Sequence, residues 1–142
     1  MRLKDQDSII KIIAACKVRP SEHLESEEVE FKEYRDIQAL HNAKDLAEEV
    51  SALANFRGGI IIVGIRDSSN VVHQNWLSQL VGFAQGDLIE IEQRLKGKLK
   101  PSLAICAEYL DFESKFYLII HVPNRRDSLI TTSSGKTCIR DG

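Results

Sequence analysis

A short charged pattern, Glu30-Phe31-Lys32, is the first feature of this sequence that could do chemistry. In an extended strand, residues i and i+2 point to the same face, so Glu30 and Lys32 are predicted to project together. Many metal-dependent nucleases use this pairing: the carboxylate holds a divalent cation, and the lysine stabilises the charge that develops on the phosphate. An ion pair on an edge strand, or two solvated side chains, would give the same tripeptide. The pattern therefore needs partners elsewhere in the chain.

Two further acids could supply such partners. Glu25 lies five residues before Glu30, in an acidic run. A solvated acidic loop accounts for that run, and so does a cation site, because clustered carboxylate oxygens suit Mg²⁺ or Mn²⁺. Asp67 follows the predicted strand 60–65, and functional residues of open α/β sheets gather beyond strand ends. A turn aspartate that binds its own backbone is the alternative for Asp67.

Several elements are predicted to position these residues. Helical spacing of apolar residues predicts a helix over 5–17, and Val29–Lys32 reads as a short strand. A second helix should begin at Asp45, where Asp45 and Glu48 fit a capping box, and end near Phe56 before Gly58-Gly59. One glycine is expected to cap that helix and the other to allow close packing. The following run 60–65 is apolar on both faces, which predicts a central buried strand.

The second half of the chain predicts one more helix and four strands. The helix uses apolar residues from Leu88 to Leu99 and stops before Pro101. Strands are expected at 103–110 and 116–122, joined by a turn at 111–115, and at 129–132 and 137–140. The order of elements predicts an α+β fold: a single domain with a mixed, mostly antiparallel sheet and about three helices. We expect an N-terminal helix and linker over 1–21 and the domain over 22–142.

Composition limits the class of protein. The 142 residues suit one domain, and the net charge of −2 gives no overall basic excess. A nucleic-acid binder of this composition must gather its basic residues on one face, or cover some carboxylates with metal. The widely spaced Cys16, Cys106 and Cys138 give no zinc pattern and suggest reduced thiols. Neither a run of the ~18 apolar residues that a membrane span needs nor a signal peptide is recognised, so a cytoplasmic location is expected.

Basic and aromatic residues offer candidates for nucleic-acid contacts. Arg125 and Arg126 fall in a predicted exposed loop, and Lys136 and Arg140 lie near the end of the chain, so these four are the predicted phosphate contacts. The lysines late in the third helix could instead complement the helix dipole. Three aromatic residues could stack on bases, although such residues more often belong partly to the core: Tyr34, Phe56 and Trp76.

Taken together, the ordered motifs resemble the Schlafen AlbA_2 domain family over about residues 22–142. The residues that carry the resemblance are Glu25-Ser26, Glu30-Phe31-Lys32, the run from Glu49 to Asn55, Gly58-Gly59, Val63-Gly64-Ile65, Asp67, Pro101, Val122-Pro123 and Ile139-Arg140 before Gly142. The chain departs from the family pattern at Arg66, where a second acid is common, and in the turn Ser68-Ser69-Asn70, which lacks a glycine. Family members normally continue past this point, which suggests a domain taken from a longer chain.

The resemblance implies two functions. In the nuclease-competent members, three carboxylates form a metal-dependent endoribonuclease site that cuts transfer and ribosomal RNA. By resemblance these are Glu25, Glu30 and Asp67, which would bind Mg²⁺ or Mn²⁺ with Lys32 beside them; no organic cofactor is predicted. The alternative is a non-catalytic DNA- or RNA-binding module of a transcriptional regulator or an ATPase-linked protein. RNA is favoured over DNA as partner, and a homodimer or a second lobe would complete the groove. A domain that binds another protein is the third possibility.

Overall fold

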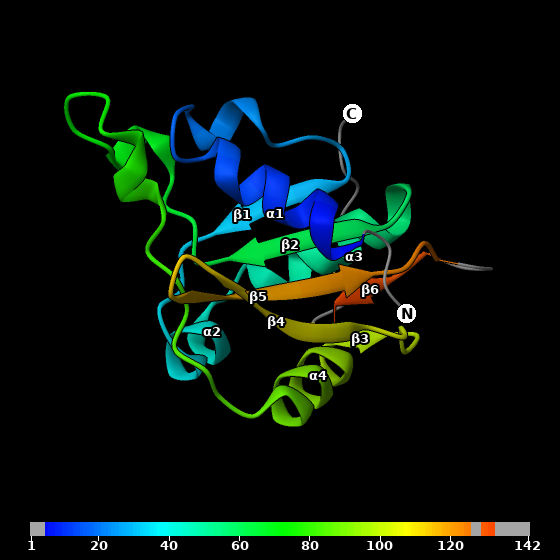
Figure 1. The fold of residues 1–142 in the computed structure, drawn as a ribbon. Coiled ribbons are helices and arrows are strands. Elements are labelled where there is room, and N and C mark those ends of the chain that lie inside the picture. The colour runs from blue at the N-terminus through cyan, green and yellow to red at the C-terminus, as the bar shows by residue number, and fades with distance from the viewer. Residues whose placement is uncertain (1–4, 126–128, 133–142) are drawn as a thin grey trace.

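The computed structural model describes residues 5–125 and 129–132 (Figure 1). The helices and strands, in chain order, are α1 (Gln6–Ala15), β1 (Val29–Lys32), α2 (Ile37–Asn42), α3 (Leu46–Phe56), β2 (Gly59–Val63), α4 (Leu88–Gly97), β3 (Leu99–Lys100), β4 (Cys106–Phe112), β5 (Lys115–Val122) and β6 (Thr131–Thr132). Short 3₁₀ turns lie at Ser21–His23, Ser68–Asn70 and Trp76–Gln79. None of the helices in these described ranges is long and apolar enough to cross a membrane.

The main sheet has the strand order β1-β2-β5-β4. β1 and β2 run parallel, with Glu30 opposite Ile61, whereas β5 is antiparallel to both β2 and β4. β3 and β6 form a small second sheet. This arrangement confirms the predicted fold class, a mixed and mostly antiparallel sheet with helices in one domain.

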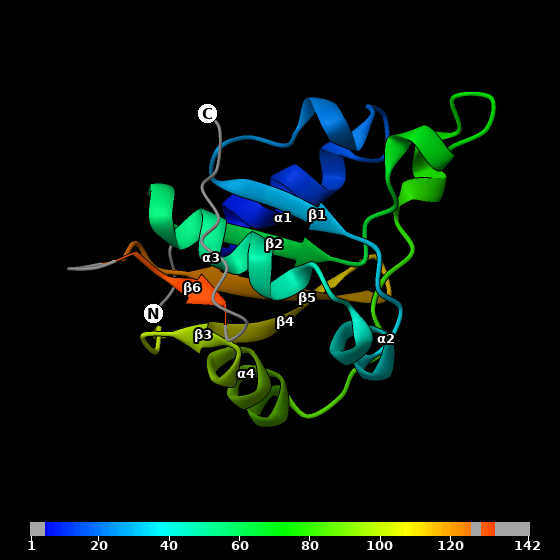
Figure 2. The same cartoon turned by 180° about the vertical axis from the view of Figure 1, so that it is seen from behind.

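Helices cover both faces of the main sheet (Figures 1 and 2). On one face α1 packs its buried Ile9 and Ile13 against the sheet. On the other face the buried residues of α3 and α4 form a second core that includes Leu53 and Ile91. The predicted central strand is confirmed, because every residue of β2 is buried and the two cores meet on its opposite sides.

Some predicted boundaries are wrong. Leu99 does not belong to the third helix, which ends at Gly97; Leu99 begins β3 and pairs with Thr132. The turn predicted at 111–115 is shorter, because the ladder runs to the pair Phe112–Lys115 and leaves only two residues with positive φ between them. The short helix α2 was not predicted. The strand predicted over 137–140 lies outside the described residues.

The two adjacent glycines divide their roles as predicted. Gly58 has φ of 80°, and its N–H donates to Leu53 O at 2.7 Å at the end of α3. A Cβ added at Gly59 would lie 2.3 Å from Glu28 O, so only glycine lets β2 begin this close to β1. The Gly58-Gly59 pair therefore fixes where β2 starts beside the strand that carries Glu30 and Lys32.

Candidate functional site

The chain brings several charged residues to one end of the main sheet. β1 and β2 are parallel and end at the same edge, and β5, which runs the opposite way, begins there at Lys115. α3 also begins near this end, because it runs back to the start of β2. The loops after β1 and β2 add Arg35 and Arg66 to the same region. This end is therefore the place where the sequence-predicted site must be sought.

Lys32 is held in a cluster with residues from the start of α3. Its Nζ lies 2.6 Å from Asp45 Oδ2 and 3.7 Å from Glu49 Oε1, and its side chain is 16% exposed. Tyr34 OH donates to Asp45 Oδ1 at 2.8 Å. Burial disfavours the charged amine, but the hydrogen bond to Asp45 and the charges of Glu49 and Glu30 outweigh it and raise the pKa of Lys32.

The pKa of the Asp45 carboxyl group is also set by burial and hydrogen bonds that act in opposite directions. Burial alone would raise its pKa, but the hydrogen bonds from Lys32 and Tyr34 hold the pKa of Asp45 below its usual range. Because both carboxylate oxygens are taken up in this way, Asp45 makes no side-chain capping bond to α3. The predicted capping box is therefore wrong: a tertiary ion pair has replaced the local cap.

Glu30 and Glu25 lie beside β1. Val29 and Phe31 are buried on the α1 side, so Glu30 and Lys32 share the opposite face, as the alternation predicted. Glu30 lies close enough to contribute to the raised pKa of Lys32. Glu25 approaches β1 from outside the sheet, and its Oε2 accepts a hydrogen bond from Phe31 N–H at 3.4 Å. β1 is the edge strand, so this contact covers part of its open edge.

Asp67 serves a local turn. Its Oδ1 accepts from Ser69 N–H at 2.9 Å, and this hydrogen bond holds the pKa of Asp67 below its usual range. Within residues 5–125 and 129–132, no group of three or more His, Cys, Asp and Glu side chains is placed to hold a metal ion. As arranged here, Glu25, Glu30 and Asp67 do not fit a shared divalent cation, and the three-carboxylate site stays a prediction.

A groove with basic walls opens at the same end of the sheet. It has a volume of about 490 Å³. The residues that line it are Arg35, Arg66, Asn75, Leu77, Ser78, Leu80, Val81 and Lys115, so it has three cationic residues and no acidic one. We call it the basic groove.

One carboxylate organises two of these cations. Arg35 Nη2 lies 3.4 Å from Glu33 Oε2, and Arg66 Nε lies 3.5 Å from Glu33 Oε1. Lys115 Nζ donates to Leu80 O at 2.5 Å. Each arginine thus uses one nitrogen on Glu33 and keeps further N–H donors of its planar fork, the geometry that suits phosphate oxygens. Three cations and one carboxylate leave the region with a net positive charge.

The predicted phosphate contacts lie elsewhere or outside the described residues. Arg125 follows β5, and its backbone N–H donates to Ala54 O at 2.9 Å, which places it at the opposite end of the sheet from the basic groove. Arg126, Lys136 and Arg140 fall outside the described residues. Sequence reasoning missed the basic groove. The available signal was a basic residue just beyond each of two predicted strands, Arg35 and Arg66.

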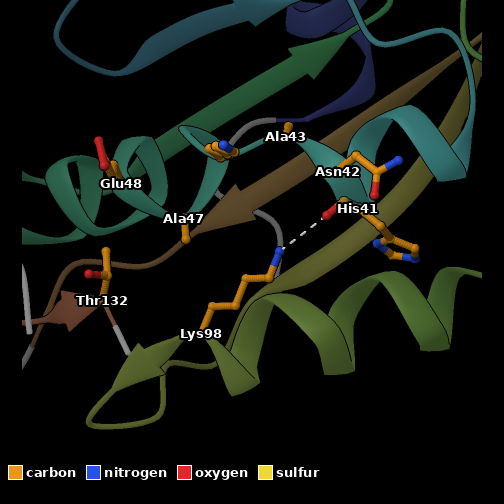
Figure 3. A pocket seen from close by; sticks show the side chains of 8 residues that line it. His41, Asn42, Ala43, Ala47, Glu48, Lys98 and Thr132 are labelled. Atoms are coloured by element: carbon orange, nitrogen blue, oxygen red, sulfur yellow. Dashed lines mark hydrogen bonds between the residues drawn. The ribbon is translucent and has the colours of Figure 1, made fainter. Parts of the chain in front are cut away.

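A second, smaller hollow lies on the α3 side of the sheet (Figure 3). It has a volume of about 290 Å³, and both lysines Lys44 and Lys98 and the acid Glu48 line it. Figure 3 shows the Lys98 side chain, just after α4, reaching towards the last turn of α2, where its Nζ donates to His41 O at 3.5 Å. Its charges are mixed, which makes it a weaker candidate for a polyanion than the basic groove.

Comparisons with known proteins agree with this fold. A crystal structure of the DIP2311 protein from Corynebacterium diphtheriae superposes with a TM-score of 0.61 at 22% identity, covering 96% of this chain and 24% of that one. This chain thus spans about a quarter of that protein. A solution structure from Nitrosomonas europaea gives a TM-score of 0.58 at 19% identity, covering 99% and 92% of the two chains. It is the N-terminal domain of a protein whose name relates it to the ATP-dependent DNA helicase RecG.

Sequence comparison supplies the family. A search of curated protein sequences gives no significant match. The family profile described as Schlafen, AlbA_2 matches residues 25–142, most of the chain and the same span that holds Glu25, Glu30 and Asp67. The chain belongs to the Schlafen AlbA_2 family.

Proposed function

We propose that this domain is a non-catalytic nucleic-acid-binding module, and that it holds the phosphate backbone in the basic groove. The observation that carries the proposal is the lining of that groove, where Arg35, Arg66 and Lys115 are brought together without an acidic residue. The chain as a whole has a net charge of −2, so binding to a polyanion requires its cations to be concentrated in one place. The basic groove meets that condition.

Geometry also favours a backbone contact over a small-anion site. The basic groove is an open hollow whose cations come from three different parts of the chain: the loop after β1, the loop after β2 and the start of β5. Spread cations can contact successive phosphates, and arginine can bind each phosphate through two N–H groups. The helicase-related name of the Nitrosomonas europaea protein is a reason to test DNA beside RNA.

Salt-dependent binding tests the proposal. Anisotropy of labelled RNA and DNA strands would be measured between about 50 and 300 mM salt for the wild type and for Arg35→Ser/Arg66→Ser. Each lost phosphate contact should lower the slope of log affinity against log salt by about 0.7 to 0.9. Arg57→Ser/Arg94→Ser is the matched control, because it also removes two arginines that have acidic neighbours, and both lie outside the basic groove. Equal slopes for wild type and double variant would reject the proposal.

Metal-dependent cleavage of structured RNA is the second candidate function. What favours it is that the family's three acids are present and that Glu30 shares a face with Lys32. The test is incubation of transfer RNA with the domain, with and without Mn²⁺, beside Glu30→Gln. Cleavage that needs Mn²⁺ and is lost in the variant would establish this function and replace the non-catalytic proposal. Intact RNA in every arm would reject it.

A further inference from the structure

One long segment of the chain lacks fixed charge. No Asp, Glu, Lys or Arg occurs from Ser68 to Gly86, although these residues make up 28% of the whole sequence. A stretch of this length would ordinarily hold several of them. The segment nevertheless contains many hydrogen-bonding side chains, among them His73, Gln74 and Asn75. Such a composition suits contacts that need hydrogen bonds and apolar surface without net charge.

The outer part of this segment, residues 71–78, is named the tip loop. It projects from the fold beyond the ends of β1 and β2 (Figures 1 and 2). Val72 is 66% exposed and Leu77 is 55% exposed, and both are large apolar side chains. Leu77 also lines the basic groove, together with Asn75 and Ser78 of the same loop. An apolar and hydrogen-bonding surface thus adjoins the cationic one.

The base of the tip loop is firmly attached to the fold. Gln79 is fully buried, and its side-chain amide accepts from Ser21 N–H and donates to the carbonyl oxygens of Cys16 and Arg19, each at 2.8 Å. These contacts fix one end of the loop to the segment that follows α1. A loop held in this way loses little conformational entropy when it binds a partner.

The tip itself has an unusual backbone. His73 and Gln74 have φ of 54° and 56°, a left-handed conformation that side chains other than glycine seldom adopt. Both side chains are exposed. Local hydrogen bonds support the turn, including Ser78 Oγ to Asn75 O at 2.7 Å and Asn75 N–H to Val72 O at 3.1 Å. Such conformations often occur where a loop presents side chains to a ligand.

We propose that the tip loop contacts unpaired bases of a nucleic-acid strand whose phosphates lie in the basic groove, an inference that rests on the proposed function. In a duplex the base faces are covered by stacking, so apolar and aromatic side chains reach them without an unstacking cost only in unpaired segments. Leu77 and the half-buried Trp76 supply that apolar contact. The absence of acidic residues avoids repulsion of the phosphates. The partner is therefore a single strand, or an unpaired loop, of RNA or DNA.

The sequence provides its own reporter for this contact. Trp76 is the only tryptophan in the chain, so fluorescence excited at the red edge of tryptophan absorption, where the tyrosines do not absorb, reports on the tip loop. The wild-type chain would be titrated with an unlabelled twelve-nucleotide strand, with the same strand annealed to its complement, and with inorganic polyphosphate. We expect the single strand to quench Trp76 strongly, the duplex to quench it less, and polyphosphate to bind with no quenching. Equal quenching by strand and polyphosphate would overturn the inference.

Two variants separate this inference from the proposed function. Leu77→Ser should weaken single-strand binding by about fivefold, the lower end of what removal of a stacking aromatic costs, and leave the salt slope unchanged. Ile89→Ser, at an apolar residue on α4 that is at least as exposed as Leu77, should have no effect.

If Leu77→Ser and Ile89→Ser bind equally well while the groove variant still lowers the salt slope, the tip-loop contact is rejected and the proposed function stands. If only Leu77→Ser weakens binding, the groove proposal is rejected instead. Quenching by anionic lipid vesicles and not by the strand would also overturn the inference.

Discussion

Two charged clusters meet at the same end of the sheet, and they use their charges differently. In the first, Lys32, Asp45 and Tyr34 bind one another, with Lys32 Nζ 2.6 Å from Asp45 and its side chain mostly buried. In the second, Arg35 and Arg66 each use one nitrogen on Glu33, and both line an open groove. The first cluster joins β1 to α3; the second leaves its cations on the wall of an open groove.

This difference shows that the residues that identify the family need not be the residues that face a ligand. Lys32, Glu25 and Asp67 all belong to the motifs that identify the family, yet each has a structural partner: Asp45, the Phe31 N–H and the Ser69 N–H. The cations with donors to spare, Arg35 and Arg66, are outside those motifs. We infer that the motif residues mainly stabilise the structure at this end of the sheet. Arg35 and Arg66, which lie beside them, make the contacts with nucleic acid that we propose. Stability and binding should then respond to different substitutions.

Charge reversal in the basic groove is expected to have the largest effect. Arg35→Glu/Arg66→Glu replaces two cations with two anions where a phosphate would lie, so affinity for single-stranded nucleic acid should fall by roughly a hundredfold or more at low salt. The free energy of unfolding should fall by no more than about 1–2 kcal/mol, because Arg35 is exposed and Arg66 is partly buried, and each makes a single long contact with Glu33. Anisotropy and urea unfolding measure the two quantities.

A matched double reversal controls for the change in net charge. Arg57 and Arg94 are 63% and 55% exposed, lie outside the basic groove and also have acidic neighbours. Arg57→Glu/Arg94→Glu therefore alters the net charge by the same amount. If this control loses as much affinity as the groove variant, binding depends on the overall charge of the domain. The claim that the Arg35 and Arg66 cluster binds nucleic acid would then be rejected.

Removal of the Lys32 amine should lower stability and leave nucleic-acid affinity almost unchanged, whereas the groove variant is expected mainly to lose affinity. Lys32→Met keeps most of the side-chain volume and deletes the ion pair with Asp45, which should lower the free energy of unfolding by about 1–2 kcal/mol, since the lysine is mostly buried. Affinity for nucleic acid should stay within about twofold. Urea unfolding and anisotropy test both expectations on the same protein.

Lys17 provides the comparison for that substitution. Lys17 Nζ also lies 2.6 Å from a carboxylate, that of Glu113, but both partners are more exposed than Lys32. Lys17→Met should therefore cost less than Lys32→Met. A tenfold loss of affinity in a stably folded Lys32→Met protein would show that Lys32 acts in the binding or reactive site and would contradict our interpretation of its cluster.

Local patterns were enough to predict most of the fold. A continuous apolar run identified β2, helical spacing identified α3 and α4, and strand alternation placed Glu30 and Lys32 on one face. The short helix α2 escaped notice, although Asp36 is a recognisable N-cap whose carboxylate accepts from Ala39 N–H at 2.8 Å.

The polar site was harder to predict, because its contacts link residues far apart in sequence. The basic groove joins Arg35, Arg66 and Lys115, and no local pattern relates the three. The capping box at Asp45 failed for the same reason. Its sequence signal is genuine, but Lys32 and Tyr34 offer the carboxylate a better set of donors once β1 and α3 are packed together. Spacing along the chain cannot rank a local cap against a tertiary ion pair.

The smallest expected effect is the pH dependence of the stabilisation that the Lys32–Asp45 ion pair provides. Acid titration also tests whether Asp45 is the carboxylate responsible. The pKa of Asp45 is lowered in the folded protein, so its ion pair stabilises the fold above the unfolded-state pKa, about 3.9, and this contribution is lost as the pH falls through the folded value. The pKa of Lys32 is raised, so its contribution is complete below about pH 10.4 and is lost only above that. The pair should therefore contribute equally at every pH from about 5 to 9.

The measurement is the difference in unfolding free energy between the wild type and Lys32→Met, obtained by urea unfolding at pH 7, 5, 4 and 3. The difference should be constant from pH 7 to 5 and then shrink by less than about 1 kcal/mol, because Asp45 is 54% exposed and solvent screens the pair. A difference that grew as the pH fell would mean that Asp45 does not carry the ion pair. A change between pH 7 and 5 would require a group that titrates there, and neither Lys32 nor Asp45 does so.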